Sequence, residues 1–400
     1  MRRAHIPVPA TKRGSCYVCA RYCVMTLARG TTLTSPSTHG PDPVGSASPS
    51  PAQWKAILAP YQRPDSWRSV IQLLNTAVPF AALWAVMAIL VDRAYWVTLL
   101  LSLPAAMLLV RMFIFQHDCG HGSFFKSRRA NNVIGGIIGV MTLVPYGYWR
   151  KTHAVHHAGS GNLDMRTFGD IDTLTVREYL KLSPSKRRHY RLYRHPLVML
   201  GIGPLFQFVF KHRWPADLPR SWQREWASIH RTNLALLAVL LIAAFTIGLE
   251  RFFLVQAPIT ILAGTIGVFL FYVQHQYEDT YWRYRDRWDY FEAALYGSSH
   301  LVLPTPLQWC TANIGLHHVH HMNSRIPNHQ LQKCFDDNPE LHRVTQLSLW
   351  QSVSTLRLTL WDEDSAQLIG FRELEARRDA VSDSPVVDPP KQEAIPKSWR

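Results

Sequence analysis

One stretch of the chain, from Val70 to Val91, contains 22 consecutive residues without a charge, "VIQLLNTAVPFAALWAVMAILV". At about 1.5 Å per residue, a helix of this length spans roughly 33 Å, which is enough to cross a bilayer. A core helix of a soluble protein is a poor alternative. We therefore predict an integral membrane protein.

Three further apolar stretches have the length of a membrane span. Very short links, "DRA" and "ERF", separate the members of each pair, so the spans should form two helical hairpins. The predicted fold is all-α, with four transmembrane helices at about 70–91, 95–115, 233–249 and 253–273. Arg111 is the one charge inside these spans, and we expect its side chain to snorkel toward the interface or to meet a lipid head group.

Two other apolar stretches, 133–149 and 196–210, are too short or too rich in glycine to cross a membrane, and they predict interfacial helices. Residues 1–52 end in a Ser/Pro/Gly-rich run that cannot bury a core, so they are predicted to be a disordered tail. Residues 376–400 read as a second tail. The membrane domain is then 53–375.

The net charge of +15 is distributed unevenly along the chain. Each short link carries one arginine, whereas nearly all other Lys and Arg residues lie before the first span, in 150–232 and after 274. The positive-inside tendency then places both termini and all long segments in the cytoplasm. Anionic lipid and an acidic protein partner are the expected ligands of this charge. No helix-turn-helix, zinc-finger or RNA-binding pattern accompanies it, so nucleic acid binding is not expected.

Histidines form three clusters with spacings that suit one face of a helix. The first is an HxxxH pattern in "QHDCGHGSFF", and the second and third are HxxHH patterns in "HAVHH" and "HHVHH". In the last cluster His318 should point away from the other three. The candidate ligands are His117, His121, His153, His156, His157, His317, His320 and His321.

Eight imidazoles exceed the four ligands of a structural zinc, so the pattern predicts two metal ions. Imidazole suits zinc, copper, iron and nickel, and the ligand set alone does not name the metal. The order of spans brings all three clusters to the cytoplasmic face, in a helical cap that an acyl chain could reach from the lipid. Unrelated surface or core histidines and a metal carrier or sensor are the alternatives. Transporters, however, place ionisable groups near the bilayer midplane, and the spans of this chain contain none except Arg111, which lies close to the interface.

The order HxxxH, HxxHH, HxxHH resembles the three histidine boxes of the membrane fatty acid desaturases. The resemblance covers roughly 60–350 and is particularly close to bacterial omega-6 (Δ12-like) acyl desaturases in "HDCGHGSFF", "VQHQYEDTYW" and "NIGLHHVHHMNSRIPN". It implies two iron ions, O2 as co-substrate and an external electron donor, either ferredoxin or a cytochrome b5-type protein. The implied reaction inserts a cis double bond into a fatty acyl chain on a lipid, CoA or a carrier protein.

The resemblance also implies a further metal ligand after the fourth span, and His275 fits that position. Glu278, three residues on, could orient His275 as an outer carboxylate, and Asn313, four residues before His317, could hold a metal-bound water. Asp118, Gln274 and Trp309 lie beside these positions, where packing explains them equally well.

Related enzymes leave the reaction type open at this point. Carotenoid ketolases or hydroxylases and other lipid hydroxylases have similar boxes, and the spacing cannot separate desaturation from hydroxylation. A non-catalytic histidine-rich metal-binding membrane protein is an alternative from another class. For an enzyme of this kind we expect a multi-pass position in a bacterial inner membrane, with the active site cytoplasmic.

Overall fold

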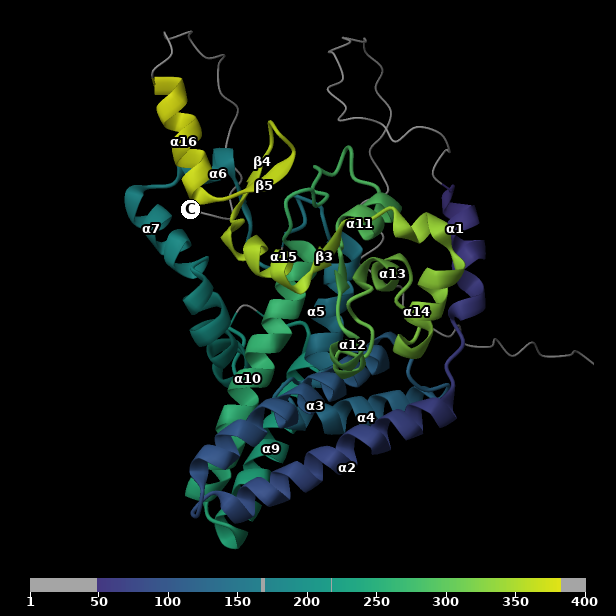
Figure 1. The fold of residues 1–400 in the computed structure, drawn as a ribbon, viewed down its shortest axis with the longest axis vertical. Helices are drawn as coiled ribbons and strands as arrows, with labels where there is room; N and C mark the ends of the chain where they lie inside the picture. Colours follow the sequence, from purple (N-terminus) through teal and green to yellow (C-terminus); the bar gives the residue numbers. More distant parts are fainter. Residues whose placement is uncertain (1–48, 167–169, 217, 383–400) are drawn as a thin grey trace, which may run out of the picture. The chain divides into compact units, whose positions relative to one another are not determined.

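Four long apolar helices, paired into two hairpins, form the lower part of the structure in Figure 1. The computed structural model describes residues 49–166, 170–216 and 218–382. Among them, the helices long and apolar enough to cross a membrane are α2 (Ser66–Leu90), α3 (Tyr95–His121), α9 (Gln223–Thr246) and α10 (Leu249–His275). The predicted helical membrane fold with two hairpins is confirmed.

The observed helices differ from the predicted spans at their ends. α3 and α10 continue beyond 115 and 273, and α9 begins at Gln223 rather than at 233. The "ERF" link is wrong, because these residues are helical and the turn is made by Ile247 and Gly248, whose φ is 87°. An apolar run marks only the embedded part of a helix, whereas caps such as Asp65 and Gly122 set where it starts and stops.

The tips of the two hairpins meet. Asp92, in the link between α2 and α3, forms an ion pair with Arg251 at the start of α10, with 2.6 Å between Oδ2 and Nη2. Farther along, the Trp84 indole of α2 donates to Gln256 of α10 over 3.0 Å. These contacts hold the hairpins together on the side of the molecule where their links lie side by side in Figure 1.

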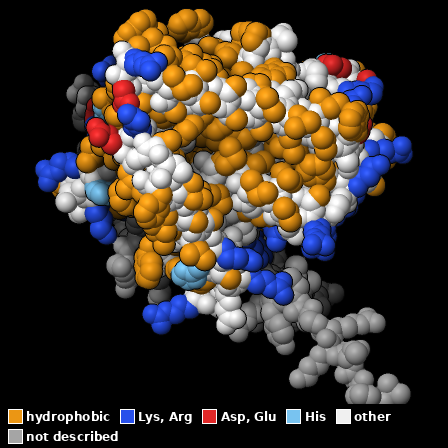
Figure 2. Space-filling view, turned by 90° about the horizontal axis from the view of Figure 1, so that it is seen from below, with side chains coloured by type: hydrophobic (Ala, Val, Ile, Leu, Met, Phe, Trp, Pro, Cys, Tyr) orange, Lys and Arg blue, Asp and Glu red, His pale blue; other side chains and the backbone are white. Residues whose placement is uncertain are grey.

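The hairpins expose large apolar side chains that no part of the described chain covers. Figure 2, seen from below Figure 1, shows a broad hydrophobic face with Lys, Arg, Asp and Glu confined to its edges. Contact of such a surface with lipid acyl chains is favourable, whereas its exposure to water is unfavourable. Its exposed residues include Leu74, Val78, Ile89, Leu100, Leu103, Leu237, Leu241, Ile242, Phe245 and Phe253.

Arg111 does not snorkel as predicted. Its side chain is buried at 3% exposure, and its guanidinium donates to Thr76 Oγ1 over 3.1 Å and to the Trp309 carbonyl. The guanidinium carbon also lies 4.0 Å from the centre of the Trp309 ring. The arginine faces the protein because a hydroxyl, a carbonyl and an aromatic face replace water there.

The first predicted interfacial stretch, 133–149, is two helices rather than one. α4 (Arg128–Met141) ends before Leu143, which has a φ of 59°, and α5 (Tyr146–Gly159) starts after Pro145. α4 exposes Val133 and Ile137 and packs its other side on α3. An interfacial position of α4 fits these exposed residues and stays a prediction.

The second stretch, 196–210, contains two π-helical turns. η2 (Val198–Ile202) and η3 (Phe206–Lys211) flank the short α8 (Gly203–Leu205) and pack on α10. The Thr265 hydroxyl of α10 donates to the Leu200 carbonyl over 2.7 Å, a bond that fastens this irregular segment to the span.

Shorter elements build a cap over one end of the spans (Figure 1). The helices are α1 (Pro51–Leu58), η1 (Ala59–Tyr61), α6 (Val176–Lys181), α7 (Pro184–Tyr193), α11 (Tyr290–Tyr296), α12 (Thr305–Cys310), α13 (His317–Met322), α14 (Asn328–Asp337), η4 (Pro339–His342), α15 (Leu349–Ser354), η5 (Thr355–Arg357) and α16 (Phe371–Ser382).

Five short strands lie within this helical cap, and the sequence analysis did not predict them. β4 (Leu360–Asp362) pairs in parallel with β1 (Leu174–Thr175) and antiparallel with β5 (Gln367–Ile369), placing Leu174 opposite Leu360 and Trp361 opposite Leu368. β2 (His300–Val302) and β3 (Gln346–Ser348) form a separate parallel pair. Because each strand has only two or three residues, the cap remains predominantly helical.

Both predicted tail boundaries need correction. Residues 50–52 are ordered, because Ser50 caps α1, whose Trp54 is 3% exposed in a cluster with Leu331 and Phe335. At the other end α16 continues to Ser382, so the tail does not begin at 376. The rest of the two predicted tails, 1–48 and 383–400, lies outside the described residues.

Candidate metal centre

Two membrane helices deliver histidines at the ends that enter the cap. α3 continues from the second span, as predicted, so His117 and His121 lie one turn apart with ring centres separated by 4.8 Å. The helix stops one residue later, at Gly122 with a φ of 72°. His275 is the last residue of α10. The histidines of α3 and α10 therefore lie at the ends of these helices that enter the cap.

The other two clusters also lie on helices, as their spacing predicted. α5 carries His153, His156 and His157, and α13 carries His317, His320 and His321. His318 does point away from these: it is fully buried beside His300 and Phe335. This location of His318 is consistent with the prediction that it is not a metal ligand.

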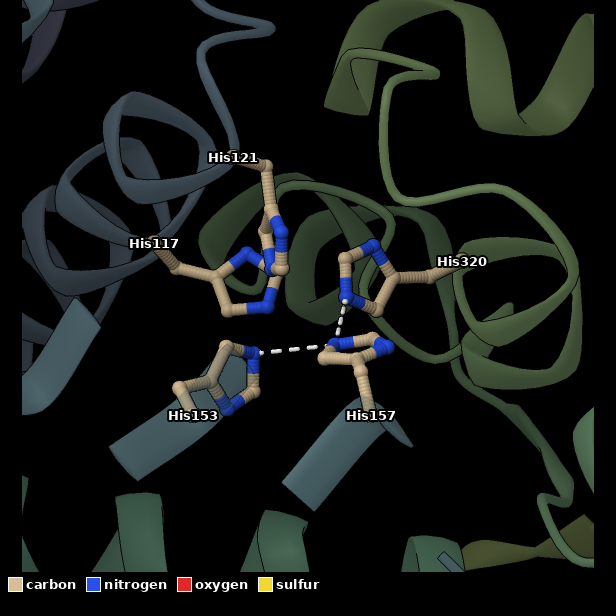
Figure 3. A group of neighbouring side chains, drawn as sticks. All are labelled: His117, His121, His153, His157 and His320. Atoms are coloured by element: carbon tan, nitrogen blue, oxygen red, sulfur yellow. Dashed lines mark hydrogen bonds between the residues drawn. The ribbon is translucent and has the colours of Figure 1, made fainter. Parts of the chain in front are cut away.

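Nine histidines gather into two groups, which we call the five-histidine group and the four-histidine group. Within each group, one ligand atom from every residue lies within 4.8 Å of the others. In Figure 3, the rings of the five-histidine group surround one common point. The groups are His117, His121, His153, His157 and His320, and His156, His275, His317 and His321.

The helices do not present one ligand face each, as the spacing alone suggested, but divide their histidines between the groups. α5 gives His156 to the four-histidine group and its neighbours to the other, and α13 gives His320 to the five-histidine group. The two groups adjoin where the His157 and His321 rings stack with centres 4.2 Å apart. Both groups thus share α5 and α13, while α3 adds histidines to one group and α10 adds a histidine to the other.

Distances between ring nitrogens test whether a metal fits. The Nε2 atoms of neighbouring histidines approach to 3.1 Å between His153 and His157, 3.0 Å between His157 and His320, and 3.0–3.1 Å from His317 to His275 and His321. Two nitrogens held at about 2.1 Å from one ion are about 3.0 Å apart at a right angle and about 3.4 Å apart at a tetrahedral angle. The observed spacing is therefore close to that of imidazole nitrogens that share one metal ion.

Unpartnered nitrogens agree with this fit. The Nε2 atoms of His117, His121 and His156 are buried without a hydrogen-bond partner among the described residues. Buried polar groups normally have partners, and unpartnered nitrogens directed at a shared centre are suited to binding a cation. The donor set therefore accommodates one metal ion in each group.

Burial keeps five of the nine imidazoles neutral. Five histidines on α5 and α13 have a pKa well below the usual 6.5. The main cause is burial, and the neighbouring imidazoles add to it. A neutral ring offers a lone pair to a cation, whereas imidazolium does not. These histidines are His153, His157, His317, His320 and His321.

Three histidines are oriented through Nδ1. His117 Nδ1 lies 3.3 Å from Asp118 Oδ1, His156 Nδ1 lies 2.5 Å from Asp170 Oδ1, and His275 Nδ1 donates to the Gly297 carbonyl over 3.1 Å. Such contacts fix the tautomer and turn Nε2 toward a metal. Sequence reasoning missed Asp170, because it lies in a loop after α5 with no motif to mark it.

The structural premise for Glu278 is wrong, whereas the role suggested for Asn313 stays a prediction. α10 ends at His275, so Glu278 does not share a helix face with it; Glu278 is exposed, and Gly297 takes the His275 contact. α13 begins only at His317, and the Asn313 amide donates to the Asn328 carbonyl over 3.0 Å. Asn313 instead occupies a turn with a φ of 61°.

Comparisons with known proteins agree with one another. A sequence model of the family described as "Fatty acid desaturase" matches residues 93–351, which include all nine histidines. A "Fatty acid desaturase" of Bacillus subtilis is 42% identical over 333 residues, covering 83% of this chain and 92% of that protein. An "sn-1 acyl-lipid omega-3 desaturase (ferredoxin)" of Synechocystis is 27% identical over 258 residues, covering 60% and 68%.

A plant relative is similar to about the same degree. The "sn-2 acyl-lipid omega-3 desaturase (ferredoxin), chloroplastic" of Arabidopsis thaliana is 26% identical over 287 residues, covering 67% of this chain and 60% of that protein.

Proposed function

The chain belongs to the fatty acid desaturase family, and from this premise we propose that it inserts a cis double bond into a membrane acyl chain with O2 and a pair of iron ions. The observation that carries the proposal is the gathering of nine imidazoles into two adjoining groups at the end of the membrane helices. The chain is an oxidoreductase of a lipid substrate, and the iron, the O2 and the double-bond position are the proposed parts.

We assign one iron to each group of histidines. The proposed ligands are His117, His121, His153, His157 and His320 for one ion and His156, His275, His317 and His321 for the other. Bound iron supplies the oxygen activation and hydrogen-atom abstraction that an unactivated methylene requires, since acid, base or nucleophile leaves such C–H bonds untouched.

The reaction balances with an external reductant. One CH2–CH2 unit, O2, two electrons and two protons give one cis CH=CH unit and two molecules of water. The two hydrogen atoms leave the acyl chain, and O2 accepts them together with the electrons and protons. We propose that a separate ferredoxin or cytochrome b5-type protein donates the electrons, in keeping with the two relatives whose names include ferredoxin.

The chain's own residues orient the histidine rings and provide an apolar surface for the acyl chain that excludes water. Burial lowers the pKa of His153, His157, His317, His320 and His321 and so keeps these five rings unprotonated. Asp118, Asp170 and the Gly297 carbonyl hold three rings by Nδ1. Apolar side chains of the spans and of the 198–211 segment provide the surface against which an acyl chain can lie. The depth at which the chain is held then selects the carbon pair.

The position of the double bond is proposed to be Δ12 or omega-6, from the sequence resemblance. Two relatives are named omega-3 acyl-lipid desaturases that use ferredoxin, at 26–27% identity, so the neighbouring omega-3 position is the competing outcome. We propose acyl groups of membrane lipids as substrates, with acyl-CoA and acyl-carrier protein as the other carriers to test.

We propose that the site faces the cytoplasm of a bacterial cell, with the four helices in the inner membrane. The basic segments around 126–129 and 283–287 would then meet anionic lipid or an acidic electron donor. The third basic segment, 186–195, is less available than its sequence suggests, because Arg194 is buried and Arg191 pairs with Glu375.

The test is expression in a bacterial host that makes no polyunsaturated lipid, with a ferredoxin system supplied, followed by mass spectrometry of the fatty acids. The wild type should produce new dienes, and His156→Ala and His320→Ala should reduce them at least a hundredfold, because each removes a ligand. Trp350→Ala, at an 85% exposed surface position, is the matched control and should retain activity. Hydroxylated or keto products in place of dienes would show instead that the protein is a hydroxylase or ketolase.

A further inference from the structure

We propose that Asp118 and Asp170 are positioning residues, one for each histidine group, and that each controls how tightly its own group holds metal. The inference rests on the proposed function, since it takes the two groups as metal sites. It goes further because it assigns a separate carboxylate to each ion, outside the set of ligands.

Asp118 serves the five-histidine group. Its Oδ1 lies 3.3 Å from His117 Nδ1, while its Oδ2 accepts from the backbone N and the side-chain Nδ2 of Asn328, at 2.8 and 2.9 Å. The carboxylate is only 2% exposed. With Nδ1 engaged, His117 directs its unpartnered Nε2 toward the group, where its ring lies 4.3 Å from that of His320.

Asp170 serves the four-histidine group through a shorter contact. Its Oδ1 lies 2.5 Å from His156 Nδ1, and the two side chains are 13% and 1% exposed. The His156 ring lies 4.7 Å from His275 and 5.1 Å from His321, with its Nε2 unpartnered among the described residues. The Asp170 carboxylate thus holds the His156 ring through Nδ1 and leaves Nε2 directed toward the group.

The distribution of carboxylates is the observation that carries the inference. Of the nine imidazoles, only His117 and His156 contact a carboxylate in the part of the chain described, and they belong to different groups. His275 has a neutral carbonyl in the same role, and the Nδ1 atoms of His157, His317 and His320 are unpartnered among the described residues.

A carboxylate behind an imidazole fixes the Nδ1–H tautomer and makes Nε2 a stronger donor to a cation. The two carboxylates should not act equally. Asp118 divides its charge between His117 and two N–H groups of Asn328, whereas Asp170 has one short contact to His156. We therefore expect the loss of Asp170 to weaken its group more than the loss of Asp118 weakens the other.

The experiment measures iron release from the purified, iron-loaded full-length protein in detergent after a coloured ferrous chelator is added. Asp170→Asn should release half of the iron about tenfold or more faster than the wild type, and the other half at the wild-type rate. Asp118→Asn should accelerate the other half, by a smaller factor. Asp170→Glu, which keeps the charge, should be closer to the wild type than Asp170→Asn.

Two controls separate positioning from general damage. Asp364→Asn changes a carboxylate that is 77% exposed and pairs with Arg177 rather than with a histidine, and it should release iron as the wild type does. In a His275→Ala/His317→Ala background, which lacks the four-histidine group, Asp170→Asn should change nothing further.

Release curves of both Asn variants that match the wild type would overturn the inference, and so would loss of both ions together from either variant. These outcomes differ from failure of the proposed function. That failure would appear in the wild type itself, as a protein that binds no iron or produces no dienes.

Discussion

Single residues in this protein are placed by contacts that sequence spacing does not reveal. The spacing of the boxes predicted eight histidines correctly as neighbours, because i, i+3 and i+4 positions share a helix face whatever the fold around them. Arg111 shows the opposite case. Its hydropathy context favoured snorkelling, yet Thr76 and the Trp309 carbonyl and ring, which come from distant parts of the chain, turn it inward.

Replacing Arg111 by methionine should therefore destabilise the protein. The change removes charge-assisted hydrogen bonds to the buried Thr76 hydroxyl and the part-buried Trp309 carbonyl. Each bond contributes about 1.5–3 kcal/mol at most. Thermal unfolding in detergent should show a clear fall in the midpoint. Arg251→Met is the matched control in the other hairpin: its ion pair is about half exposed, so the change should cost about 0.5 kcal/mol or less. Equal shifts for the two variants would contradict this account of Arg111.

His212 gives a pH dependence whose sign can be worked out. Burial, and secondarily the nearby Arg213 guanidinium, lowers the pKa of His212 to about 3. The unfolded chain takes up this proton near pH 6.5 and the folded chain does not, so folding becomes less favourable as the pH falls below about 6.5. The loss attributable to this residue reaches about 2 kcal/mol near pH 5.

His212→Phe removes the titrating group and keeps an aromatic ring against Phe208 and Tyr148. The fall in the unfolding midpoint between about pH 7 and about pH 5 should be smaller in this variant than in the wild type. Other buried histidines titrate in both proteins, and comparison of the two slopes cancels them. A variant that loses as much stability as the wild type would show that His212 is not kept neutral.

Whole elements were predictable where one strong local signal defines them. The four spans and the helices of the histidine boxes were predicted from hydropathy and spacing, and the structure confirms them. Their ends were not, because caps and glycines set them. Strands β1–β5 gave no signal, since two or three residues cannot show a period and their pairing joins segments far apart in sequence.

The first helix of the cap, α1, tests the corrected tail boundary. Trp54 packs beside residues of α13 and α14, including Val319 and Phe335. Trp54→Ala should cost about 3–5 kcal/mol and lower activity by loosening the helix that carries three box histidines. Trp350→Ala is the matched control, because that tryptophan is 85% exposed.

We expect deletion of residues 1–48 to leave activity intact. A truncated protein as unstable as the Trp54→Ala variant would contradict the corrected boundary.

The molecule as a whole brings its chemistry together from four helices that are remote in sequence. Membrane helices α3 and α10 end in the cap with His117, His121 and His275, and the shorter helices α5 and α13 contribute the rest. The sequence predicted that the boxes meet, but not that α5 and α13 divide their histidines between two groups. Nor could it identify Asp170, whose role depends on how a loop returns to α5.

The central claim is that nine histidines hold two metal ions in two separate groups. The most direct test is the iron content of the purified protein, measured by mass spectrometry for the wild type and two double variants. The account predicts two ions per chain in the wild type and one in each of His121→Ala/His153→Ala and His275→Ala/His317→Ala. A wild type that holds a single ion, or a double variant that still holds two, would contradict it.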